Sequence, residues 1–194
     1  MKTLAILAAA GLTAFGSSQA AIVNGDFSAG GTGFFVFEEG GTVVFPDGAA
    51  TLATDPGLGF DVLVASVSQG DDGLFTFEPG IIVPDDATAL RFDILQAAAV
   101  SDPAEEGLLA FRPDALGVSL LDAEDPLLDV FDFFEAGDTG TFTLDVTSLE
   151  GRTVALFIDL FDEDDGFDTS FTIDNIAFVT EDLSPVPLPG AFAF

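Results

Sequence analysis

Residues 90–95 read Leu90-Arg91-Phe92-Asp93-Ile94-Leu95, in which apolar side chains at 90, 92 and 94 alternate with the residues between them. A period of two places successive side chains on opposite faces of a β-strand, so one face of this segment meets a core and the other meets water. The same alternation recurs over residues 141–146, where Phe142, Leu144 and Val146 are the apolar members. Because almost no helical period is found after residue 20, these patterns predict an all-β domain.

The segment from Val154 to Phe161 is apolar at nearly every position, with Asp159 as the exception. This pattern predicts either a central strand that is covered on both faces or a strand that faces a ligand groove. Turn residues recur along the chain and indicate ten to twelve short strands, enough for a two-sheet sandwich. Residues 97–110 could hold a helical turn, but Pro103 and Gly107 favour a long loop there.

The composition combines strong acidity with an ample apolar fraction. The chain has 34 acidic and 4 basic residues, a formal net charge of −30, and 48% hydrophobic residues that include 22 phenylalanines. Phosphate backbones and anionic lipids would be repelled unless a cation bridged them, so nucleic acid is excluded as a partner. The apolar fraction predicts a packed core rather than disorder. With no cysteine to form a disulfide, a metal ion becomes an attractive crosslink.

Both ends of the chain indicate export. Residues 1–20 combine Lys2, an apolar stretch and the small residues around Gln19, which predicts a signal peptide cut after Ala20. We therefore expect a domain over residues 21–181 and a proline-rich linker over residues 182–194. The segment Val186-Pro-Leu-Pro-Gly190 resembles the VPLPA variant of the PEP-CTERM-like sorting signals of Gram-negative bacteria. In that group an apolar helix and arginines follow the motif, and neither stands before Phe194, so we expect a secreted or cell-surface protein with no stable membrane anchor in this chain.

Two segments far apart in the sequence point to a particular sandwich. The first is Ile22-Val-Asn-Gly-Asp-Phe-Ser28 and the second is Ser170-Phe-Thr-Ile-Asp-Asn-Ile-Ala-Phe178. Together with the strand motifs between them, they resemble the galactose-binding-like jelly roll of carbohydrate-binding modules. The resemblance implies an all-β, two-sheet jelly-roll sandwich whose first and last strands are neighbours.

The same resemblance implies a structural calcium ion between the two ends of the domain. Its ligands would be the carbonyl of Asp26, the position of Ser28, the side chain of Asp47, the carbonyl of Ala50 and the carboxylate of Asp174. Calcium takes carboxylate and carbonyl oxygens together, as turn-rich strand edges can supply. The family usually has an acid where Ser28 stands, which would leave this site one charge short. The alternative is that residues 24–26 form only a turn and that Asp174 hydrogen-bonds a neighbouring strand.

A second acidic cluster lies over residues 162–168, but its spacing does not fit an EF-hand. A loop begun at Asp162 needs glycine at its sixth position, and Gly166 is fifth; its twelfth position is Ile173 instead of glutamate. The cluster is therefore interpreted as a solvated loop between the last two strands, or as a weak surface cation site.

Catalytic chemistry has little support in the residue inventory. The absence of histidine and cysteine excludes imidazole bases, thiol nucleophiles and zinc sites of the ordinary type. Acids are plentiful, and Asp159 and Asp174 are expected on adjacent strands, but nothing singles out a glycosidase pair. The three arginines after the signal peptide, Arg91, Arg112 and Arg152, are expected to pair with acids. We predict that the protein is not an enzyme.

Sugar binding would need exposed aromatic rings, and all 22 aromatic residues are phenylalanine. Tryptophan and tyrosine are the usual sugar platforms, because a broad ring stacks while its N–H or O–H reaches the rim. The candidates are Phe34, Phe35, Phe60, Phe131, Phe133 and Phe134, with core packing as the alternative for each.

These observations favour a non-catalytic exported module that associates with exopolysaccharide and is stabilised by calcium. The alternative is a structural or adhesive matrix protein that is crosslinked by divalent cations and has no defined glycan ligand.

Overall fold

The structure is a computed structural model that describes residues 22–54, 62–71, 77, 80–101, 113–163 and 166–180. Within these ranges the chain forms eleven strands and three single-turn 3-10 helices. The predicted signal peptide, the sorting motif, Phe60 and Arg112 lie outside the described residues. No helix among the described residues is long and apolar enough to cross a membrane.

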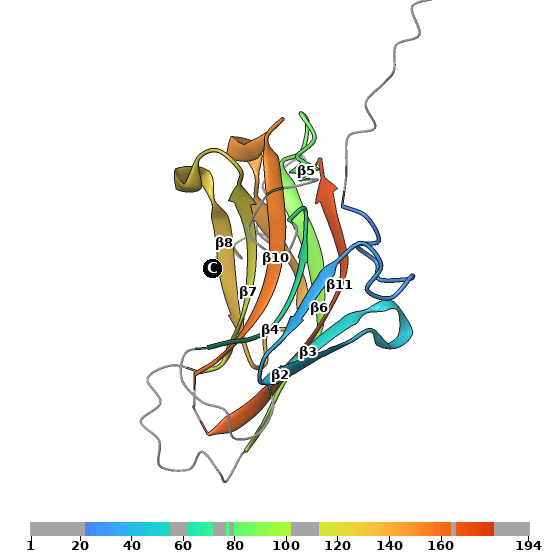
Figure 1. The fold of residues 1–194 in the computed structure, drawn as a ribbon, viewed down its shortest axis with the longest axis vertical. Helices are drawn as coiled ribbons and strands as arrows, with labels where there is room; N and C mark the ends of the chain where they lie inside the picture. The colour runs from blue at the N-terminus through green and yellow to red at the C-terminus, as the bar shows by residue number, and fades with distance from the viewer. Residues whose placement is uncertain are drawn as a thin grey trace, which may run out of the picture.

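The strands form two antiparallel sheets that pack face to face (Figure 1). Sheet A has the order β1 (Phe35–Glu38), β4 (Val62–Gln69), β10 (Thr153–Asp162), β7 (Ala115–Asp122) and β8 (Val130–Glu135), and β5 (Ile81–Ile82) pairs with the end of β10. Sheet B has the order β2 (Gly41–Val44), β3 (Ala50–Thr54), β11 (Phe167–Val179), β6 (Ala89–Ser101) and β9 (Gly140–Asp145). The helices η1 (Pro46–Gly48), η2 (Pro126–Leu128) and η3 (Thr147–Leu149) lie in connections. The predicted all-β, two-sheet sandwich of the jelly-roll class is confirmed.

The core lies between the sheets and follows the predicted alternation. In β6, Leu90, Phe92 and Ile94 are fully buried, whereas Arg91 and Leu95 are exposed. Phe92 meets Phe134 of β8 edge-on, with ring centroids 5.4 Å apart. Side chains from both sheets therefore form one apolar layer, and the burial of this layer is the main contribution to the stability of such a fold.

Strand β10 is the central strand of sheet A, as its apolar sequence predicts. It pairs with β4 along one edge and with β7 along the other, and most of its side chains are buried on both faces. Asp159 is half-buried on the face that points away from the core. Strand β10 is therefore a central strand, as one interpretation predicts, and it also lines a pocket, as the other predicts.

The prediction of a loop over residues 97–110 is wrong for residues 97–101, which belong to a strand. Strand β6 continues to Ser101, because residues 167–172 of β11 pair with it in register and supply its backbone hydrogen bonds. A small-residue run such as Ala97-Ala98-Ala99 has no alternation to reveal a strand, so only this long-range pairing defines it. Residues 102–110 lie outside the described part of the chain.

The two ends of the domain meet, as the resemblance implies, although the opening segment is not a strand. The Ile176 N–H of β11 donates to the Gly25 carbonyl at 2.8 Å, and Phe27 is fully buried beside Phe34 and Phe45. Consecutive strands β10 and β11 belong to different sheets, so the expectation that Asp159 and Asp174 lie on adjacent strands is wrong. The chain crosses the sandwich between them.

Candidate functional site

Two rows of side chains cross the outer face of sheet A, one residue from each of its five long strands. Residues that pair across neighbouring strands project from the same face of a sheet. The residues between the rows on the three central strands, Val67, Ile158 and Val118, are fully buried in the core, so the rows point outward. In the order β1, β4, β10, β7 and β8, the rows are Phe35, Ser68, Phe157, Ser119 and Phe131, then Phe37, Ser66, Asp159, Gly117 and Phe133. We call this surface the two-row face.

The two-row face has phenylalanine rings on its edge strands, a further ring at Phe157 of the central strand, and small or polar residues at the other positions. Each strand contributes an i, i+2 pair, such as Ser66 and Ser68 on β4. Gly117 fits this plan, because a Cβ at that position would lie 3.2 Å from the rings of both Phe133 and Phe161. Glycine therefore lets these two rings close over the floor beside β7, with centroids 6.1 Å apart.

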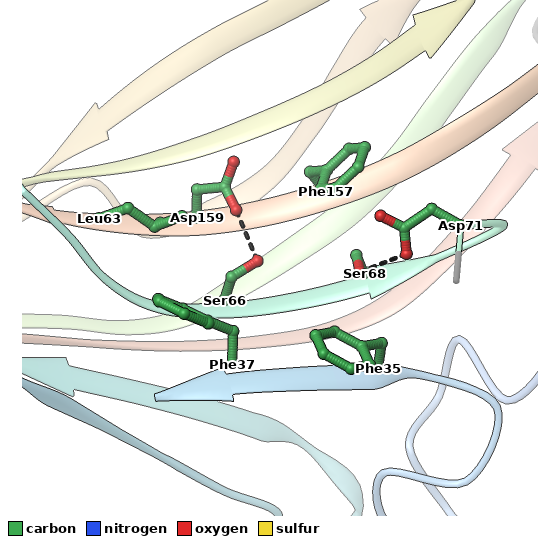
Figure 2. Close-up of a pocket in the computed structure, with 8 residues that line it drawn as sticks. All are labelled: Phe35, Phe37, Leu63, Ser66, Ser68, Asp71, Phe157 and Asp159. Carbon is green, nitrogen blue, oxygen red and sulfur yellow. Dashed lines mark hydrogen bonds between the residues drawn. The ribbon is translucent and has the colours of Figure 1, made fainter. Parts of the chain in front are cut away.

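A pocket of about 280 Å³ opens on the β1, β4 and β10 side of the two-row face (Figure 2). Its walls are the rings of Phe35, Phe37 and Phe157 together with Leu63. Its polar lining is Ser66, Ser68, Asp71 and Asp159. Figure 2 shows the two serines lying between the β1 rings and the two carboxylates.

Hydrogen bonds fix the acids against the floor. The Ser66 hydroxyl donates to Asp159 Oδ1 at 2.6 Å, and the Ser68 hydroxyl donates to Asp71 Oδ1 at 3.1 Å. Burial raises the pKa of the Asp159 carboxyl, the Ser66 hydrogen bond opposes that rise, and the Asp71 carboxylate adds to it. Both serine protons are thus given to carboxylates, and the floor faces the pocket mainly with hydrogen-bond acceptors.

The opposite edge of the two-row face carries the most exposed rings. Phe131 is 63% exposed, Phe133 is 54% exposed, and their ring centroids are 5.9 Å apart. Phe35 on β1 is 46% exposed. Exposed apolar surface on two edges of one sheet face, with polar groups between, is typical of a binding surface rather than of a solvated face.

Three of the six predicted aromatic candidates lie on the two-row face: Phe35, Phe131 and Phe133. Phe34 instead packs on Phe27 in the core, with centroids 4.9 Å apart, and Phe134 is buried against Phe92 and Phe142. Phe60 lies outside the described residues.

Sequence reasoning missed five further residues of the two-row face and two residues beside it. They are Phe37, Phe157, Ser66, Ser68 and Ser119 on the face, and Asp71 and Phe161 beside it. An i, i+2 pair of small polar residues beside apolar ones is the signal that could have identified the floor. The register that aligns those pairs across five strands cannot be read from one sequence.

The segments that carry the five predicted calcium ligands lie near one another at one corner of the sandwich. A side chain at Gly48, beside Asp47, would lie 3.6 Å from the Asp26 carbonyl oxygen and 3.9 Å from the Ser28 Cα. Ala50 of β3 pairs with Ile173 of β11, the residue before Asp174. These neighbouring segments carry carbonyl and carboxylate groups, which are the kinds of ligand that calcium prefers.

The side chains of this corner also bond to one another. Asp26 Oδ1 accepts the Ser28 N–H at 3.2 Å and its hydroxyl at 2.9 Å, which lowers the pKa of Asp26. Burial raises the pKa of Asp174, and the nearby carboxylates of Asp26 and Asp93 add to the rise. Among the described residues, no group of three acidic side chains is close enough to hold a metal ion. A cation here would have to use backbone carbonyls as well, as the predicted ligand set does.

The second acidic cluster is less solvated than the sequence suggests. Asp162 is the last residue of β10 and is buried, and Phe167 and Asp168 already belong to β11. Residues 164 and 165 lie outside the described part of the chain. The connection is therefore shorter than the predicted loop.

No protein-family model and no curated protein sequence matches this chain. Solved structures similar to it are carbohydrate-binding modules with a β-sandwich fold. A mutant of a family 29 module is 14% identical, with 81% of this chain and 88% of that chain covered and a TM-score of 0.45. A CBM4 module is 16% identical, with 80% and 99% covered and a TM-score of 0.47. A CBM61 module in complex with β-1,4-galactotriose is 12% identical, with 84% and 100% covered and a TM-score of 0.47. At these values the likeness says nothing about what this chain binds.

Proposed function

We propose that this chain is a non-catalytic glycan-binding module and that a polysaccharide chain binds on its two-row face. The observation that supports this most directly is the arrangement of that face: exposed phenylalanine rings at both edges of sheet A, with hydroxyl and carboxylate groups in the floor between them. The core does not need these rings, because they point away from it.

The chemistry of the face suits a polyhydroxylated polymer. The apolar face of a sugar ring stacks on an aromatic ring, and sugar hydroxyls donate to acceptors such as Asp159 and Asp71. Neighbouring strands are about 4.8 Å apart, so the rows reach roughly 19 Å from β1 to β8. That length accommodates several sugar residues of a linear chain that crosses the strands.

The predicted signal peptide and sorting motif favour export to the cell surface or extracellular matrix, where exopolysaccharide is the glycan at hand. The net charge of −30 disfavours strongly anionic polymers unless a cation bridges them. We further propose that calcium stabilises the corner formed by Asp26, Ser28, Asp47, Ala50 and Asp174. Burial and the neighbouring carboxylates raise the pKa of Asp174, and a bound cation would offset both effects.

Two double variants test the glycan site, with retention on insoluble bacterial polysaccharides as the measurement. Phe35→Ala with Phe37→Ala removes one edge, and Phe131→Ala with Phe133→Ala removes the other. Each ring contributes about 0.5–1.5 kcal/mol by stacking, so each pair should weaken binding by roughly 5- to 150-fold. Phe167→Ala, a change of the same kind on β11 of sheet B, should leave retention unchanged.

The same experiment distinguishes the proposed glycan-binding module from the alternative, a matrix protein crosslinked by divalent cations. Calcium-dependent self-association without retention on any polysaccharide would favour that alternative. Equal losses in all three variants would also contradict a site on the two-row face, because the control lies on the other sheet.

A further inference from the structure

We infer that the glycan bound by the two-row face carries free amino groups, and that the pocket between β1 and β10 receives an ammonium group of an amino sugar. This inference rests on the proposed function and names the class of glycan. It is argued from the pocket's charge, its hydrogen-bonding groups and its aromatic walls.

The pocket is acidic, and the basic side chains of the described residues lie elsewhere. Arg91 and Arg152 are the basic residues within the described part of the chain. Arg91 lies on β6 in sheet B, and Arg152 is bound to Asp122. The charged groups in the pocket lining are the carboxylates of Asp71 and Asp159. Burial removes hydrating water from the Asp159 carboxylate, and attraction to a positively charged ligand would offset that cost.

The hydrogen-bonding groups of the floor are acceptors. Ser66 and Ser68 already donate their protons to Asp159 Oδ1 and Asp71 Oδ1, at 2.6 and 3.1 Å. The second carboxylate oxygen of Asp159 points away from Ser66 (Figure 2). An ammonium group offers three donors and no acceptor, whereas a sugar hydroxyl offers one donor and two acceptors. The floor therefore matches an ammonium group better than a neutral hydroxyl.

The walls suit the same ligand. Phe35, Phe37 and Phe157 surround the polar floor, and a cation over a phenyl face is attracted to its π-electrons. The same rings can stack on the apolar C–H face of the sugar that carries the amine. A metal ion fits less well, because it needs oxygen ligands on all sides, whereas the walls of this pocket are three phenyl rings and a leucine.

Three hexasaccharides that share a β-1,4 backbone test the inference with the full chain: cellohexaose, the hexamer of N-acetylglucosamine and the hexamer of glucosamine. Titration calorimetry at low and high sodium chloride gives each dissociation constant. We expect the glucosamine hexamer to bind at least 10-fold more tightly than the other two at low salt. Screening should narrow this gap at high salt.

Asp159→Asn keeps the shape of the side chain and a carbonyl that can accept from Ser66, but removes the charge. It should weaken binding of the glucosamine hexamer about 10-fold or more, because the ion pair with the ammonium group is lost; this factor corresponds to about 1.4 kcal/mol. Binding of cellohexaose should change by less than about 3-fold. Glu150→Gln removes the same charge from an exposed position in the connection to β10, and it should leave all three constants unchanged.

The possible failures are distinguishable. If cellohexaose or the N-acetylated hexamer binds as tightly as the glucosamine hexamer, and Phe35→Ala with Phe37→Ala weakens it, the proposed glycan site stands and the inferred amine does not. If hexalysine binds as tightly as the glucosamine hexamer, and the phenylalanine variants leave both unchanged, the acidic surface merely attracts polycations and the inference is overturned. Absence of binding by every hexasaccharide overturns the inferred amine. Retention on bacterial polysaccharides then decides the proposed function separately.

Discussion

Asp122 is a buried acid whose charge is matched by that of Arg152. It is 5% exposed, and its carboxylate accepts from the Nε and Nη2 of Arg152, the latter at 2.8 Å. The backbone N–H groups of Glu124 and Asp125 donate to it at 2.9 and 2.7 Å. The hydrogen bond from Arg152 is the main reason that the pKa of Asp122 is lowered to about 2. The expected pairing of Arg152 with an acid is confirmed.

Asp122→Asn should lower the free energy of unfolding by about 2–3 kcal/mol at pH 7, because it removes the charge of a buried carboxylate that is paired with the partly exposed Arg152 guanidinium. The folded pKa of about 2 lies below the ordinary value of 3.8, so the unfolded chain binds the proton first. The charge therefore stabilises the fold above about pH 4, and this contribution is lost as the pH falls towards 2. Urea unfolding at pH 7 and pH 2.5 measures the difference, which should shrink at the lower pH.

Glu124→Gln is the matched control for Asp122→Asn. The Glu124 side chain is 86% exposed and its contact with Arg152 is 3.9 Å, so its loss should change stability by less than about 0.5 kcal/mol. A difference between wild type and Asp122→Asn that is the same at both pH values would show that the charge of Asp122 is not the stabilising feature.

Some strands can be predicted from alternation in the local sequence, but others are defined only by pairing between distant segments. The apolar patterns predict strands over residues 90–95 and 154–161, and the structure confirms both. The extension of β6 to Ser101 depends on β11, about 70 residues later, so the local composition could not reveal it. The candidate site shows the same limit: Phe35, Phe131 and Phe133 were recognisable as candidates, but their alignment with Ser66 and Asp159 follows from register alone.

The opening segment docks on β11 through a contact that only glycine permits. A Cβ at Gly25 would collide with the carbonyl oxygen of Ile176. Gly25→Ala should therefore displace residues 22–28 from β11, lower stability by more than about 2 kcal/mol and expose the buried Phe27. The specific measurement is hydrogen exchange at the Ile176 N–H, which now donates to the Gly25 carbonyl and should lose its protection.

Gly137→Ala is the control for this prediction. Gly137 has a φ of +99°, and a Cβ at this position would have no neighbouring atom within 4 Å. Alanine there meets backbone strain of about 1–2 kcal/mol but no collision. Its effect on the Ile176 N–H should not exceed its effect on global stability. Selective loss of protection in this control, or its retention in Gly25→Ala, would contradict the docking role of Gly25.

For the whole molecule, the net charge of −30 works against a compact state, and the chain has no disulfide to oppose it. The buried layer between the sheets supplies the main stabilisation, so folding does not require the acids to be paired. Mutual repulsion makes any cation stabilising to some degree through screening. A specific calcium site must therefore be distinguished from the general effect of salt.

Calcium chloride should raise the melting temperature of the full chain more than sodium or magnesium chloride at equal ionic strength. A ligand at 100 times its dissociation constant stabilises the folded state by about 2.7 kcal/mol, which is roughly 5–10 °C for a domain of this size. Asp174→Asn should remove the calcium-specific increment but keep the general salt effect, because Asp174 supplies the anchoring carboxylate of the proposed corner. Asp132→Asn, an exposed acid on β8, should keep both. An equal rise with all three salts, or no fall when a chelator is added, would reject the proposed ion and leave screening as the whole effect.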